Sequence, residues 1–160
     1  MKEHTYAVRM TWTGNDGAGT EHYKSYRRDH VYTAPGKPDL PGSSDPHFRG
    51  DASRYNPEEL LVAALSSCHM LWYLHLCAVN NVNVVEYEDD ASGIMQENAD
   101  GSGQFLSVTL KPRAKITATS DAQKALALHD DVHHLCYIAR SVNFPVHAHA
   151  IIEVAEQVSK

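Results

Sequence analysis

Three cysteines, Cys68, Cys77 and Cys136, are the residues of this sequence with the broadest chemistry. A thiolate can act as a nucleophile, form a disulfide or bind a metal ion, whereas a buried thiol behaves as a small apolar side chain. Residues 1–6 carry charge and no apolar run follows them, so we expect a cytoplasmic protein with reduced thiols. An odd number of cysteines there argues against a structural disulfide framework, and leaves catalysis, redox sensing, metal binding or simple burial.

The spacing of the cysteines limits how they can cooperate. Cys68 and Cys77 lie nine residues apart in one predicted helix and face roughly opposite ways, so they cannot pair within it. Cys68 is also far from the positive end of that helix, so a reactive thiolate there needs a cation from elsewhere in the chain. Cys136 falls in a later predicted helix, in line with His133 and Arg140, and these basic neighbours favour a thiolate.

The helix that positions Cys68 has the clearest boundaries in the sequence. Asn56 is a favoured N-cap, Pro57 suits the first helical position, and Glu59 can reach back to the Asn56 amide. The helix continues through Val79 and residues 80–81 stop it. Its length would fit a membrane span, but the two serines and two histidines inside it favour the central helix of a folded domain. Because it is apolar on every side, we expect it to be buried on every side, within a domain or across a dimer.

The remaining segments predict an α+β fold with a single domain over residues 1–160. Strands are indicated by alternating apolar and polar residues, and turns by clusters of Gly, Asn, Asp and Pro. The predicted elements, in order, are strands 4–13 and 20–33, a loop over 34–54, the helix from Asn56, strands 82–96 and 103–118 joined by a turn at 98–103, a helix from Ser120 or Asp121 to about Val142, and a strand from Val146 to Val158.

Composition excludes several classes of protein. The chain has 160 residues, 42% of them hydrophobic, which is too apolar for a disordered chain and long enough for a core without disulfide or metal support. Its net charge is −6, and the basic residues form no stripe that could neutralise a row of phosphates. We therefore expect neither nucleic acid nor a membrane as a partner.

Two motifs resemble the OsmC/Ohr family of thiol-dependent hydroperoxide peroxidases, named for osmotic induction and organic hydroperoxide resistance. The first is the run from Asn56 to Cys68, NPEELLVAALSSC. The second is the run from His133 to Cys136, HHLC, followed by SVN at residues 141–143. Length and element order agree over nearly the whole chain. The combination of both motifs is specific, although either motif alone would be weak.

The resemblance implies a role for four residues. In that family the first cysteine is peroxidatic and the second resolving, which places these roles on Cys68 and Cys136. A glutamate and an arginine complete the family's site, and they correspond to Glu58 and to Arg49, which stands seven residues before Asn56. Arg28 and Arg54 are weaker candidates for the arginine.

The resemblance also implies an α+β OsmC-like fold, an intertwined homodimer, an organic hydroperoxide substrate, a thiol reductant that is a lipoylated protein or a small dithiol, and no cofactor. The sequence departs from the family pattern at Tyr137, where proline is common, and at His69 and Cys77. These departures indicate a divergent branch.

The expected chemistry sets geometric demands. Glu58 and Cys68 are separated by about 15 Å of helical rise, so a site that uses both needs Glu58 from a partner chain or an arginine that spans the gap. We therefore expect a composite site in a symmetric dimer. The apolar neighbours of Cys68, among them Leu65, Leu71 and Trp72, favour organic hydroperoxides over hydrogen peroxide.

Three other interpretations remain open. A metal site could use His129 and His133, His147 and His149, or Cys136, but no metal-binding motif joins them, and solvated helical histidines are the simpler interpretation. A stress-related small-molecule binding protein could keep the fold without turnover. Any of the cysteines could also be only part of the core, and this is the favoured interpretation for Cys77.

Overall fold

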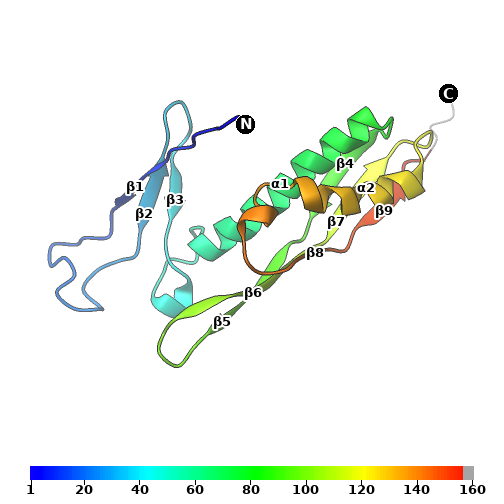
Figure 1. The fold of residues 1–160 in the computed structure, drawn as a ribbon. Helices are drawn as coiled ribbons and strands as arrows, with labels where there is room; N and C mark the ends of the chain where they lie inside the picture. Colours follow the sequence, from blue (N-terminus) through cyan, green and yellow to red (C-terminus); the bar gives the residue numbers. More distant parts are fainter. Residues whose placement is uncertain (157–160) are drawn as a thin grey trace. The chain divides into compact units, whose positions relative to one another are not determined.

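The computed structural model describes residues 1–156 of the chain. The chain divides into two compact units, Met1–Leu60 and Leu61–Lys160. Their elements follow one another along the chain in Figure 1: β1 (Arg9–Trp12), β2 (His30–Thr33), β3 (Leu40–Gly42), η1 (Pro46–Phe48), α1 (Pro57–Val79), β4 (Val84–Asp89), β5 (Ser92–Glu97), β6 (Gly103–Leu110), β7 (Pro112–Ile116), α2 (Ala122–Leu135), η2 (Ala139–Ser141), β8 (Val146–Ala148) and β9 (Ile151–Val154).

The first unit is built on an antiparallel sheet in the order β1-β2-β3. The first two predicted strands are present and pair with each other, with Arg9 opposite Thr33 and Trp12 opposite His30, but both are shorter than the predicted ranges 4–13 and 20–33. The prediction of a plain loop over residues 34–54 is wrong, because this segment contains β3 and the short helix η1. The buried Ser43 ties the segment together: its hydroxyl donates to Asp29 at 3.2 Å and accepts the amide of Asp51 at 3.0 Å.

Helix α1 begins with the predicted capping box. The amide of Glu59 donates to Asn56 Oδ1 at 2.8 Å, and the amide of Asn56 donates to Glu59 Oε2 at 3.1 Å. These two bonds satisfy backbone donors that the first turn of a helix leaves free. The helix then runs unbroken to Val79, as predicted.

One stripe of α1 is buried, formed by Leu65, His69, Tyr73 and Cys77 at four-residue spacing. Within one chain the helix is not buried on every side, because Leu71 and Val79 are well exposed, and burial across a dimer stays a prediction. By length and composition α1 could also cross a membrane, but its buried stripe packs into the protein's own core, as the central helix of a folded domain does.

Two three-stranded sheets complete the second unit, β4-β7-β9 and β5-β6-β8. The sequence predicted two long strands over residues 82–118, whereas the structure divides each of them, at residues 90–91 and at Lys111. The predicted turn at 98–103 is confirmed between β5 and β6, and Gly101 there adopts φ 83°, a conformation that favours glycine. The β4–β7 and β5–β6 pairs are antiparallel.

The Asp89 carboxylate lies where the strands break. It accepts the amide of Lys111 at 2.7 Å and the hydroxyl of Ser66 on α1 at 2.5 Å. The break is therefore tied to the helix two residues before Cys68.

The C-terminal segment adds one strand to each of these sheets. β8 lies parallel to β6 and β9 lies parallel to β7. The predicted single strand from Val146 to Val158 is therefore two short strands, and its last two residues lie outside the described range.

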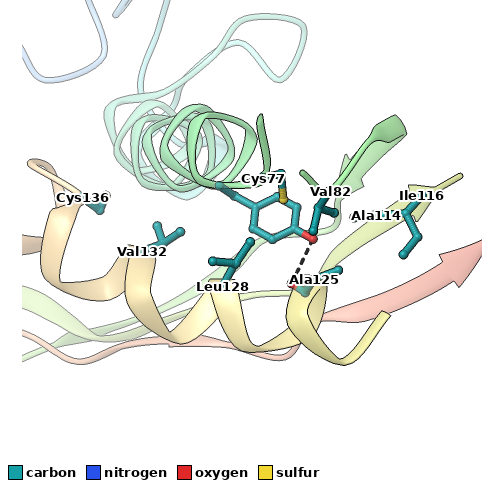
Figure 2. Packing of buried hydrophobic residues seen from close by; sticks show 9 residues of the cluster. Cys77, Val82, Ala114, Ile116, Ala125, Leu128, Val132 and Cys136 are labelled. Carbon is teal, nitrogen blue, oxygen red and sulfur yellow. Dashed lines mark hydrogen bonds between the residues drawn. The ribbon is translucent and has the colours of Figure 1, made fainter. Parts of the chain in front are cut away.

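The main apolar cluster lies between the two helices and the sheet that contains β7. Figure 2 shows Ala125, Leu128 and Val132 of α2 facing α1, with Ala114 and Ile116 of β7 alongside. The dashed line in the figure marks a hydrogen bond from the Tyr73 hydroxyl to the backbone oxygen of Ala125, at 3.1 Å. This cluster fixes α1 and α2 side by side, and so sets the positions of the residues that they carry.

Candidate functional site: a cysteine pair beside a histidine-lined cavity

The structure brings Cys68 and Cys136 together. Cys136 is 2% exposed and belongs to the main apolar cluster, and the half-buried Cys68 packs against the same cluster. The pKa of the Cys136 thiol is raised to about 11, first by burial and then by a hydrogen bond with the Cys68 side chain. Both residues are free thiols, so the α1–α2 contact brings together two residues that could form a disulfide.

Cys136 occupies the end of α2 and not its interior. Asp121 caps the start of the helix as one of the two predicted caps, but the helix ends at Leu135, well before the predicted Val142. The amide of Cys136 closes the last turn on Val132, and the amide of Ala139 donates to the Cys136 sulfur at 3.4 Å. The predicted stabilisation of a thiolate by basic neighbours is wrong, because burial dominates and holds Cys136 as a thiol.

His69 and His129 form a buried pair next to the cysteines. His69 Nε2 and His129 Nδ1 are 2.9 Å apart, and the Tyr73 ring stacks on His129 with 3.7 Å between centroids. Burial lowers the pKa of both imidazoles, that of His129 to about 3, so both are neutral near pH 7. The interpretation of His129 as a solvated helical residue is therefore wrong. The four-residue spacing of Leu65, His69 and Tyr73 was the available signal for this pair.

A cavity of about 360 Å³ opens beside this pair within the second unit. Six histidines line it, namely His69, His129, His133, His134, His147 and His149, together with Cys136 and apolar residues that include Leu65 and Leu110. His129 Nε2 is buried and has no hydrogen-bond partner among the described residues. Within residues 1–156 no three His, Cys, Asp or Glu side chains converge in a way that could hold a metal ion.

Arg49 and Glu58 lie in the first unit. Arg49 follows η1 in the left-handed conformation, with φ 66°, and its side chain is exposed. Glu58 lies in the first turn of α1, so it shares one unbroken helix with Cys68. Their assignment to the site of Cys68 stays a prediction.

The two weaker arginine candidates have neighbours of their own in the first unit. Arg54 is within ion-pair distance of Asp51 at 3.4 Å and of the buried Asp29 at 4.0 Å. The guanidinium of Arg28 lies over the rings of Tyr23 and Tyr26, 4.4 and 4.1 Å from their centroids. These contacts give both arginines structural roles, whereas Arg49 makes no ion pair in the described part of the chain.

The fold and the paired cysteines define a class: α+β proteins whose long central helix presents a thiol to a second thiol at the end of a later helix. Comparison with known proteins identifies the family. The sequence model of OsmC-like proteins matches residues 50–149, so the chain belongs to the OsmC-like family.

Solved structures agree with this assignment. The chain is similar to an OsmC-like protein of unknown function from Vibrio cholerae, with 32% identity and a TM-score of 0.82 over 94% of this chain and 100% of that one. It shares the fold of an organic hydroperoxide resistance protein OsmC from Legionella pneumophila, with 15% identity and a TM-score of 0.67 over 96% and 100% of the two chains. It also shares the fold of the organic hydroperoxide resistance protein OhrB of Bacillus subtilis, with 19% identity and a TM-score of 0.58 over 94% and 98%. A search of curated proteins gave no significant match.

Proposed function

We propose that this protein is a cysteine-based peroxidase that reduces organic hydroperoxides. Cys68 is the nucleophile and Cys136 the resolving thiol. The observation that carries the proposal is that these two side chains come from different helices and meet at one apolar cluster, where Cys68 contributes to the raised pKa of Cys136. Fold relatives named as organic hydroperoxide resistance proteins support the same chemistry.

In the first step the Cys68 thiolate attacks the distal oxygen of ROOH. The O–O bond breaks, the sulfur becomes a sulfenic acid, and the departing alkoxide takes up a proton to leave as ROH. A cation beside Cys68 is needed to hold the thiolate and to stabilise the charge on the departing oxygen. Arg49 is the proposed cation, and Glu58 is the proposed carboxylate that orients it.

In the second step Cys136 condenses with the sulfenic acid. The new S–S bond forms as the S–OH bond breaks, and the proton of the Cys136 thiol leaves with the hydroxyl group as water. The raised pKa of Cys136 suits this role, because the residue keeps its proton until the sulfenic acid is present. The Ala139 amide, which donates to the same sulfur, stabilises the charge that develops on it as the proton leaves.

The surface one turn beyond Cys68 fits an apolar substrate. Leu71, Trp72 and His75 line a shallow cavity of about 250 Å³ on α1, at positions that follow Cys68 on one helix face. An alkyl or lipid hydroperoxide can bury its hydrocarbon part against such side chains, whereas hydrogen peroxide gains nothing there. Comparable rates with cumene hydroperoxide and hydrogen peroxide would contradict this preference.

A second copy of the chain completes the site in this proposal. Cys68 and Glu58 lie ten residues apart on one helix, so a shared site draws the carboxylate from the partner chain. Mixed dimers of Cys68→Ser and Glu58→Gln chains contain one site with both native residues, so mixing two inactive variants restores part of the activity. Full activity of a monomer in analytical ultracentrifugation fractions would refute the composite site.

Mass spectrometry after one equivalent of cumene hydroperoxide tests the thiol chemistry. The native chain loses about 2 Da as Cys68 and Cys136 form a disulfide, and Cys136→Ser gains about 16 Da as the sulfenic acid persists. Cys68→Ser shows neither change. Cys77→Ser is the matched control, because it removes an equally buried thiol and leaves the disulfide intact. A native chain that keeps its mass favours a binding protein without turnover.

A further inference from the structure

The histidine-lined cavity has one property that the peroxide reaction does not use. Cys136 lines this cavity of about 360 Å³, and Cys68 is not among the described residues that line it. The wall of the cavity therefore includes the buried resolving residue and not the proposed nucleophile. The volume is in the range of pockets that hold small organic ligands.

We propose that this cavity admits the thiol reductant, a small-molecule dithiol or dithiol arm, and that the reductant attacks Cys136 rather than Cys68. This inference rests on the proposed function, because the disulfide must form before it can be reduced. It assigns the peroxide to Cys68 in the reduced protein and the reductant to Cys136 in the oxidised protein.

The reaction balances with groups that the cavity supplies. A reductant thiol loses its proton to an imidazole at the end of α2, His133 or His134, and its sulfur attacks the Cys136 sulfur. The Cys68–Cys136 bond breaks, and Cys68 leaves as the thiolate that the next peroxide requires. The second thiol of the reductant then attacks the mixed disulfide, closes a cyclic disulfide, and releases Cys136, which takes up the proton. The net change is two electrons and two protons from the dithiol to the protein.

Imidazole is suited to this step because it exchanges protons near neutral pH, where a free alkyl thiol is mostly protonated. His133 and His134 lie on the last turn of α2, three and two residues before Cys136. The buried pair deeper in the wall is different, because the lowered pKa of His69 and His129 keeps both rings neutral.

The inner wall also offers a contact for the rest of the reductant. His69 fixes His129 through Nδ1, and this leaves the His129 Nε2 atom buried without a partner among the described residues. An unsatisfied buried nitrogen costs free energy until a ligand supplies a hydrogen bond. A hydroxyl or amide on the reductant can supply it, while apolar carbons of the same molecule contact Leu65 and Leu110.

Trapping the mixed disulfide identifies the attacked sulfur. The Cys68–Cys136 disulfide of the Cys77→Ser chain is first formed with diamide, which oxidises thiols without peroxide. A monothiol, 2-mercaptoethanol, is then added, the reaction is stopped at early times with an excess of N-ethylmaleimide, and the peptides are mapped. The expected result is mercaptoethanol on Cys136 and maleimide on Cys68. The reverse labelling overturns the proposal, as does failure of diamide to join the two cysteines.

A second measurement tests the role of the histidines. Reduction of the diamide-made disulfide by dithiothreitol is followed for the chain carrying His133→Gln and His134→Gln, with His22→Gln, at an exposed histidine of the first unit, as the control. We expect the double variant to react roughly tenfold to a hundredfold more slowly near pH 7 and to recover as pH rises and the reductant ionises itself. An unchanged rate overturns the proposed base. Because diamide forms the disulfide without peroxide, both measurements can be interpreted even if the peroxidase proposal fails.

Discussion

Cys136 and Cys77 differ little in exposure but much in surroundings. They are 2% and 1% exposed, and burial raises the pKa of both thiols. Figure 2 shows Cys136 at the end of α2 and Cys77 beside Val82 at the end of α1. Cys136 has Cys68 as a neighbour, whereas Cys77 has the hydroxyl of Tyr73. Burial alone therefore does not decide the chemistry of a thiol here; the presence of a second thiol within reach does.

The largest expected difference in turnover is between a variant that breaks the Cys68–Cys136 pair and a variant that removes Cys77 from the core. Cys68→Ser should lower peroxidase turnover to the background rate, because the nucleophile is lost. Cys77→Ser should keep turnover within about twofold of the native rate, because that thiol contacts only the core. Turnover is measured with cumene hydroperoxide and a dithiol. If Cys77→Ser were the inactive variant, the assignment of roles would be reversed.

The end of the core around Tyr73 should contribute more to the free energy of unfolding than the end around Cys136. Tyr73 is fully buried, stacks on His129 and donates to the Ala125 carbonyl. Tyr73→Ala should lower the free energy of unfolding by about 3–5 kcal/mol, as large-to-small aromatic substitutions do in packed cores. Urea unfolding measures the change. Cys136→Ala is the comparison at the other end of the core. It should lower the free energy of unfolding clearly less, because it removes a smaller side chain.

Acid should weaken the core through His129. When the chain is unfolded, this residue binds a proton as pH falls below about 6.5, whereas in the folded core its pKa is about 3. Stability is therefore retained above pH 6.5 and lost as pH falls from there towards 3, by about 2 kcal/mol at pH 5. His129→Gln should flatten this dependence of the unfolding free energy on pH.

His69 is the partner of His129 in the buried pair. The Asp89 carboxylate raises the pKa of His69, and the His133 imidazole lowers it. His134→Gln is a control on the exposed part of α2. A pH dependence that is the same in the His129→Gln and native chains would contradict a neutral buried pair.

The smallest expected effect separates two neighbouring tyrosines. Tyr73→Phe should cost about 1 kcal/mol, because it leaves the Ala125 carbonyl without its hydrogen bond. Tyr87→Phe should be neutral or slightly stabilising, since the buried Tyr87 hydroxyl has no partner among residues 1–156. Equal losses in urea unfolding would show that the Tyr87 hydroxyl has a partner of its own.

Local signals in the sequence were sufficient for much of the fold. The capping box at Asn56, the Asp121 cap and the turn at residues 98–103 act over a few residues, and the structure contains all three. The early end of α2 and the breaks within the two long strands depend on contacts between distant segments. Asp89, which joins Lys111 to Ser66 at the break, is an example that no local pattern indicates.

The residues of the candidate site could also be predicted only in part. Family resemblance paired Cys68 with Cys136, and the structure brings these residues together. The pKa of Cys136 was predicted in the wrong direction, because helical spacing shows which basic residues are near but not how much apolar surface surrounds the sulfur. The His69–His129 pair was missed because its members come from different helices, sixty residues apart.

The parallel strands β8 and β9 set an order of events during synthesis. Each pairs with a strand made about forty residues earlier, β6 or β7, so β6 and β7 remain edge strands until residues 146–154 leave the ribosome and the shorter β8 and β9 take over those edges. Open strand edges readily pair with other chains. A nascent chain with both cysteines already made is therefore still exposed to aggregation, and rapid addition of this last segment protects it.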